Sequence, residues 1–149
     1  MDSGRKTLWD MIRGIRYAML ASRDDDGLLR SRPLTTQNRR LDDDDSLWFF
    51  VTRTSELALD LGRNPAVNVA YADPETERYV SIAGVAVLEE DPARSEALWS
   101  AEAKTWFPDG PHDSNLQLLR VRIAAAEYWD EKTRAMVVCP VLVRAAAGD

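Results

Sequence analysis

The sequence has only one cysteine and one histidine among its 149 residues. Because Cys139 has no second cysteine to pair with, the chain can form no internal disulfide and no cysteine-based metal site. His112 alone excludes a zinc site built from several histidines. This usage is typical of a reducing compartment, so we expect a cytoplasmic protein.

The chain also lacks a long apolar run. No stretch approaches the roughly 18–20 apolar residues of a membrane-spanning helix, and the polar start of residues 1–4 lacks the apolar segment of a signal peptide. Glycine-rich nucleotide-binding fingerprints are absent as well. We therefore expect no membrane anchoring, and any redox chemistry would have to come from a bound cofactor.

Basic residues are fewer than acidic ones: the chain has 19 lysines and arginines and 25 acidic residues, which gives a net charge of −6. Nucleic acid and anionic lipid would each demand a basic face, so the sequence argues against both partners. A small anionic ligand stays open, because one local cluster of arginines is enough. We interpret the acidic runs 24–26 and 42–45 as solvated turns and expect no metal site, since neither has calcium-loop spacing.

Side chains suited to catalysis are few. His112 has Gly110, Pro111 and Asp113 as neighbours, which indicates a surface loop, and nothing in the sequence pairs it with a nucleophile. Cys139 precedes Pro140 in an apolar run, a context that favours an inert core thiol. The sequence therefore identifies no catalytic residue.

The order of predicted elements indicates a mainly β fold. Alternating apolar residues predict strands at 17–22, 28–35, 46–52, 67–71, 78–90, 116–129 and 135–143. Helical spacing predicts helices over 6–14, from Glu56 to the breaker cluster 62–65, and from Pro92 to about Thr105. Because strands and helices do not alternate regularly, we expect one domain with six or seven antiparallel strands in a barrel or sandwich.

The loop after the strand 46–52 has the composition of an anion site. Arg53, Thr54 and Ser55 stand at the mouth of the helix that begins at Glu56, where the first amides are unpaired and the helix dipole is positive. The alternative is that Thr54 or Ser55 simply caps the helix. Taken alone, the segment favours capping.

Three early segments, in this order, resemble the FMN-binding split barrel of the pyridoxamine 5′-phosphate oxidase-like superfamily: Arg30-Ser31-Arg32-Pro33-Leu34, Leu47 to Thr52, and Ser55 followed by Asn64-Pro65-Ala66-Val67. Three later segments resemble its general stress protein branch: Tyr79 to Gly84, Trp106 to Gly110, and Ala126 to Asp130. The similarity extends over roughly residues 8–137.

The resemblance implies a homodimeric split β-barrel, residues 1–149, that binds FMN or another flavin across its dimer interface. It implies that the phosphate and ribityl chain meet Arg32, Thr52 and Ser55, with Arg53 as a further helper. Backbone groups of Pro33, Leu34, Phe50 and Val51 would line the flavin ring. Trp106 and Trp129 would cover the ring from the partner chain, although both are equally suited to be ordinary dimer contacts.

One position departs from the family. Relatives carry a basic residue two positions after the loop serine, near the flavin phosphate, and here that position is Leu57. We expect Leu57 beside the phosphate, so that Leu57→Lys would tighten FMN; the alternative is that Leu57 packs with Leu61 in the core. In either case, Arg32 or Arg53 would compensate for the charge that is missing at position 57.

The resemblance leaves three functions open. The first is an FMN-binding general stress protein that does not oxidise pyridoxamine phosphate, because the basic and histidine groups for that substrate are missing. The second is a flavin-dependent reductase or oxidase of another small substrate. The third is a split barrel that has lost flavin and acts as an interaction module.

Overall fold

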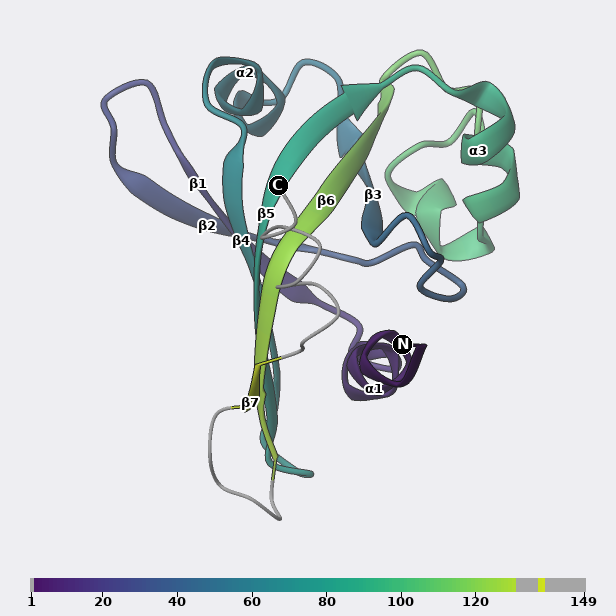
Figure 1. Cartoon of the computed structure of the whole chain (residues 1–149). Coiled ribbons are helices and arrows are strands. Elements are labelled where there is room, and N and C mark those ends of the chain that lie inside the picture. The colour runs from purple at the N-terminus through teal and green to yellow at the C-terminus, as the bar shows by residue number, and fades with distance from the viewer. Residues whose placement is uncertain (1, 131–136, 139–149) are drawn as a thin grey trace.

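One strongly bent antiparallel sheet forms most of the protein (Figure 1). The computed structural model describes residues 2–130 and 137–138. In those residues the strands follow the order β2-β1-β4-β5-β6-β3, and β7 pairs with β6. Their bounds are Ala18–Arg23 (β1), Leu29–Leu34 (β2), Ser46–Thr52 (β3), Ala66–Asp73 (β4), Arg78–Glu89 (β5), Leu116–Trp129 (β6) and Val137–Val138 (β7).

Within residues 2–130, three α-helices and one 3-10 helix accompany the sheet. They are α1 (Asp2–Ile12), α2 (Glu56–Arg63), α3 (Pro92–Leu98) and η1 (Ala101–Thr105). In Figure 1, α2 lies near the upper ends of β1 and β4, α1 lies below it near the N-terminus, and α3 stands beside β3. Among the described residues, no helix is both long and apolar enough to cross a membrane.

The chain that follows β2 bends the sheet toward closure. The Gln37 amide donates to the Trp48 carbonyl oxygen at 2.8 Å, and the Asn38 side chain accepts from the Trp48 amide and donates to the Ser46 carbonyl oxygen. The end of β2 therefore runs into a segment that lies against β3, although the two strands are at opposite edges of the sheet. This arrangement confirms the predicted mainly β, antiparallel split barrel.

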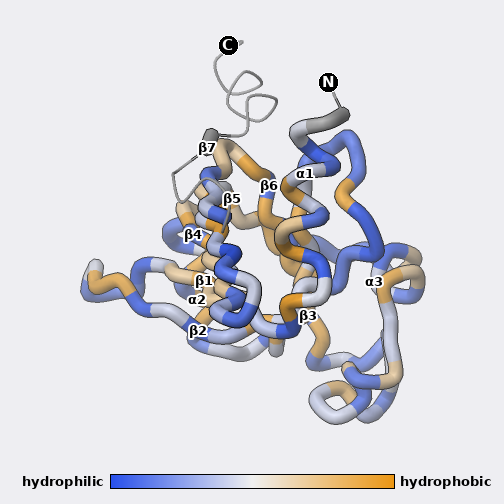
Figure 2. Tube along the Cα trace, turned by 90° about the horizontal axis from the view of Figure 1, so that it is seen from below, coloured by the Kyte–Doolittle hydropathy of each residue, from blue (hydrophilic) through white to orange (hydrophobic). Residues whose placement is uncertain are grey.

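Strand β3 is buried on both faces because its side chains alternate between two clusters. Leu47, Phe49 and Val51 belong to the main core, which α1, α2 and most strands share. Trp48 and Phe50 point into a smaller cluster formed with α3, η1 and the start of β6. Figure 2 shows hydrophobic segments around β3, β5 and β6 and near α1, and another toward the tip of the β1–β2 hairpin.

Three predictions differ from the structure. The helix expected over residues 6–14 begins and ends earlier, since α1 runs from Asp2 to Ile12. The helix expected from Pro92 to Thr105 breaks at Trp99, which is extended, and Arg39 donates to the Ala97 and Trp99 carbonyl oxygens there. The acidic run 42–45 is more than a solvated turn: Asp42, Asp44 and Asp45 each pair with an arginine. Most of the strand predicted at 135–143, with Cys139, lies outside the described residues.

Candidate functional site

Two ion pairs connect β2 to α2. Arg30 Nη1 lies 3.2 Å from Glu56 Oε2, and Arg32 Nη2 lies 3.3 Å from Asp60 Oδ2. We call these two contacts the β2–α2 ion pairs. They hold the side chains of an edge strand against the first two turns of α2, which brings Arg32 to the helix whose start contains Ser55.

Arg32 sits in the better protected of the two pairs. Its Nη1 also donates to the hydroxyl of Ser22, a buried residue of β1, at 3.2 Å. Asp60 is only 5% exposed, so its carboxylate depends on Arg32 for a counter-charge. Neither Ser22 nor Asp60 was predicted as a site residue, because the contact joins three elements that are distant in the sequence.

Ser55 caps α2, as the sequence alone favoured. Its hydroxyl accepts from the Ala58 amide at 3.1 Å, and its own amide donates to the Thr52 carbonyl oxygen. The amides of Glu56 and Leu57 come earlier in the first turn, where helical geometry provides no acceptor within the helix. Capping and anion binding are compatible here, since the cap satisfies only one of the first-turn amides.

Leu57 is a core residue, and our expectation that it lies beside a phosphate is wrong. It is 4% exposed and belongs to the main core, as does Leu61 one turn later. Residues four apart share a helix face, so the side that would have to meet a phosphate is the side that packs on the sheet. The alternative stated above, packing with Leu61, is the observed one.

The residues expected to line a flavin ring lie at the ends of β2 and β3. Leu34 is partly buried against the main core, and Val51 is buried in it. Phe50 packs in the smaller cluster, edge-on to Phe107 with ring centroids 6.3 Å apart. With these side chains engaged, any ligand contact from Phe50 and Val51 would come from their backbone.

The two late tryptophans belong to different elements. Trp106 follows η1 and is 77% exposed, the most exposed large hydrophobic side chain among the described residues. Trp129 ends β6, where it is registered opposite Tyr79 of β5. Within one chain the structure does not bring them together with Arg32 and Ser55.

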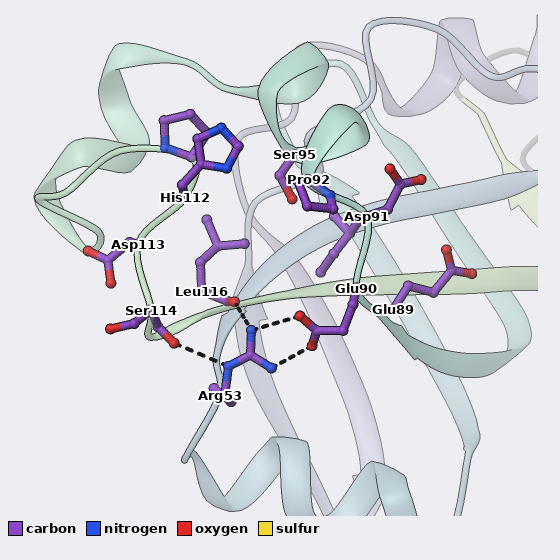
Figure 3. A pocket seen from close by; sticks show the side chains of 12 residues that line it. Arg53, Glu89, Glu90, Asp91, Pro92, Ser95, His112, Asp113, Ser114 and Leu116 are labelled. Carbon is purple, nitrogen blue, oxygen red and sulfur yellow. Dashed lines mark hydrogen bonds and ion pairs between the residues drawn. The ribbon is translucent and has the colours of Figure 1, made fainter.

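Arg53 points away from the start of α2 into a pocket of about 160 Å³ (Figure 3). Its guanidinium donates to both carboxylate oxygens of Glu90, to Gln117, and to the carbonyl oxygens of Ser114 and Leu116. The hydrogen bond to Glu90 raises the pKa of Arg53 and lowers the pKa of Glu90. Arg53 is thus placed among protein acceptors, and not beside Ser55.

Most carboxylates of this pocket already have structural partners. Asp113, which is buried, accepts from the amides of Asp109 and Asn115, and Asp91 caps α3 through the Arg94 amide. His112 lies in the expected surface loop, with its Nε2 against the Glu96 carboxylate. In the other acidic run, Asp24 accepts from two amides of its own turn.

Sequence comparison identifies the family to which this fold and these motifs point. Residues 3–149 match the family model described as "Pyridoxamine 5′-phosphate oxidase like". The chain belongs to this family. No curated protein sequence matches the chain significantly.

Solved structures of general stress proteins have the same fold. The general stress FMN/FAD binding protein of Xanthomonas citri is 26% identical, with a TM-score of 0.72 over 92% of this chain and 95% of that one. General stress protein 26 of Bacillus anthracis is 25% identical, with a TM-score of 0.72 over 86% of this chain and 94% of that one. A Clostridium acetobutylicum protein related to general stress protein 26 is 14% identical, with a TM-score of 0.74 over 87% and 88%, and supports the fold alone.

Proposed function

We propose that this protein is a cytoplasmic, single-domain FMN-binding protein of the general stress type. The observation that carries the proposal is that Arg32 of β2 and Ser55 at the start of α2 are brought to one helix by the β2–α2 ion pairs. Its family and the printed flavin binding of the Xanthomonas citri neighbour support it.

The donors around the start of α2 suit a phosphate monoester. A guanidinium, a hydroxyl and first-turn amides are groups that bind phosphate. Arg32 and Ser55 would hold the phosphate, Thr52 the ribityl chain, and the backbone from Pro33 to Leu34 and from Phe50 to Val51 the ring. A bound flavin would supply the electron-accepting chemistry, and the chain would position it and limit its contact with water.

We further propose that the functional unit is a homodimer with the flavin between the chains. The β1–β2 hairpin leaves Met19, Leu28 and Leu29 exposed, and β2 is an edge strand. Trp106, the residue that follows η1, is exposed as well. A partner chain that covered these apolar side chains would remove them from water and place its tryptophan near the ring.

Two measurements test this function. Purified protein titrated with FMN should quench the flavin fluorescence at a ratio of one flavin per chain, and light scattering should give twice the chain mass of 16.8 kDa. A stable monomer at micromolar concentration would contradict the shared site. The absence of any flavin binding would instead support an interaction module that has lost the cofactor.

Added reduced nicotinamide separates the remaining alternatives. If the reduced nicotinamide bleaches the absorbance of the bound flavin, the protein is a flavin-dependent reductase. If the absorbance persists, it is a flavin-binding protein without that activity. The buried Leu57 contributes no charge at this site, so the affinity for FMN depends on the neighbouring arginines of β2.

A further inference from the structure

A second arginine stands next to the proposed phosphate site. Arg30 and Arg32 are two residues apart on β2, so their side chains leave the same face of the strand. Their partners Glu56 and Asp60 are four residues apart on α2 and share one face of the helix. The β2–α2 ion pairs therefore run side by side, and the Arg30 pair lies nearer the start of the helix.

The two pairs differ in how firmly they are held. In the inner pair, the side chains of Arg32 and Asp60 are 20% and 7% exposed. In the outer pair, those of Arg30 and Glu56 are 50% and 76% exposed. An exposed ion pair is weak, so a stronger anion can displace its carboxylate.

Most N–H groups of the Arg30 guanidinium make no hydrogen bond to the described residues. Among the described residues its guanidinium makes one hydrogen bond, to Glu56, although it carries five N–H groups. Glu56 is the first residue of α2 and directly follows Ser55, so this contact draws Arg30 to the place where the phosphate would bind. Position 57, where the family resemblance led us to expect a basic residue, is a leucine in the core and supplies no positive charge.

We propose that Arg30 supplies the positive charge that Leu57 cannot, and that Glu56 competes with the flavin phosphate for Arg30. The inference rests on the proposed flavin-binding function and concerns the selection of FMN over unphosphorylated riboflavin. Phosphate binding exchanges the Glu56 carboxylate on Arg30 for a phosphate oxygen, and Glu56 then turns to solvent. The pair thus sets how strongly the site prefers the phosphorylated flavin.

The test compares FMN with riboflavin by fluorescence titration. Arg30→Ala should weaken FMN about tenfold to a hundredfold while leaving riboflavin unchanged. Glu56→Gln should tighten FMN about twofold to fivefold, again without effect on riboflavin. The matched controls are Arg40→Ala and Asp42→Asn, which break an exposed arginine–aspartate pair in the loop after β2 and should alter neither ligand.

A charge-conserving variant and salt identify the cause. Arg30→Lys should recover part of the FMN affinity, because it keeps the charge but loses the planar fork. The differences among these variants should shrink as ionic strength rises. Equal losses for FMN and riboflavin, or an Arg30→Ala variant that behaves like Arg40→Ala, would overturn the proposal.

Inorganic phosphate separates this proposal from the proposed function. In the wild-type chain without flavin, phosphate should shift the amide resonances of Ser55, Glu56 and Leu57 in a saturable way, and Arg30→Ala should reduce these shifts. If phosphate causes these Arg30-dependent shifts but the protein binds no flavin, the proposed function is wrong, whereas the role of Arg30 in anion binding stands. Shifts that do not depend on Arg30, or that are absent, would contradict the role of Arg30.

Discussion

Arg53 and Arg32 precede the same helix, and the family resemblance led us to expect both near the flavin phosphate, yet their contacts in the structure differ. The guanidinium of Arg53 makes five hydrogen bonds within the described residues, two of them to backbone carbonyl oxygens. Arg32 makes two longer contacts, to Ser22 and Asp60. Since a guanidinium carries five donors, Arg53 has little left for a ligand, whereas Arg32 keeps most of its capacity.

The contacts of Arg53 explain what it does instead. Its amide donates to the Asn115 carbonyl oxygen at 2.7 Å, and its side chain reaches Ser114 and Leu116 on either side. Arg53 thereby fastens the end of β3 to the start of β6. The number of protein acceptors that a guanidinium already contacts therefore distinguishes a structural arginine from one that is available to an anion. A sequence motif alone does not make this distinction.

The largest expected effect concerns α2, the helix that follows both arginines. Leu57→Lys should lower the free energy of unfolding by about 3 kcal/mol, because it places an ammonium in the main core. Leu59→Lys is the matched control on the exposed face of α2 and should be nearly neutral. Urea denaturation of both variants checks this. If Leu57→Lys were as stable as the control and bound FMN more tightly, the assignment of Leu57 to the core would be wrong.

Arg53→Ala comes next. It should lower the free energy of unfolding by about 2 kcal/mol, since Glu90 and two carbonyl oxygens lose their donor. The figure is kept small because the Arg53–Glu90 pair is partly exposed and solvent weakens its attraction. The ratio of FMN to riboflavin affinity should stay as in the wild type. Thermal melts and paired flavin titrations measure the two quantities. A selective loss of FMN binding with an unchanged melting temperature would reverse the contrast with Arg32.

Arg32→Ala and Ser55→Ala should show the opposite pattern in binding. We expect each to weaken FMN by about tenfold and riboflavin much less, because riboflavin has no phosphate for these groups to contact. Ser55→Ala should also lower stability by about 1 kcal/mol through loss of the helix cap. Fluorescence titration with both flavins measures the selectivity. Equal losses for the two ligands would place Arg32 and Ser55 outside the phosphate site.

The smallest effect is a pH dependence of the Arg53 contact. The hydrogen bond from Arg53 lowers the pKa of Glu90 below its ordinary value of 4.5. The stabilisation is therefore fully present above about pH 4.5 and is lost as the pH falls through the lowered value in the folded state. Denaturation between pH 3 and pH 6 should show a shallower fall in stability for Glu90→Gln than for the wild type. Identical slopes would mean that this pair does not contribute.

Much of the fold could be read from the sequence because local patterns determine it. Strands β3 and β6 were predicted with the bounds observed, since each is rich in apolar, aromatic or β-branched residues. The end of α3 could not be read, because Arg39 reaches its carbonyl oxygens from a distant loop. The partners of the acidic run 42–45 were missed for the same reason, since Arg5 and Arg120 come from other elements.

The candidate site was less predictable. The family position of Leu57 suggested a phosphate contact, but its four-residue spacing with Leu61 was the better guide to the face it occupies. Arg30 belonged to a segment that resembles the family, but it was not predicted as a site residue. Its period-two spacing with Arg32 was a usable signal, whereas the pairing of β2 with α2 depends on the tertiary fold.

A crystal structure of the dimer with FMN tests the contrast between the arginines most directly, since it locates the phosphate. The account predicts phosphate oxygens within hydrogen-bond distance of Arg32, Arg30 and the first-turn amides of α2, with Arg53 still bound to Glu90. A phosphate bound by Arg53, with Arg30 and Arg32 still on Glu56 and Asp60, would contradict it.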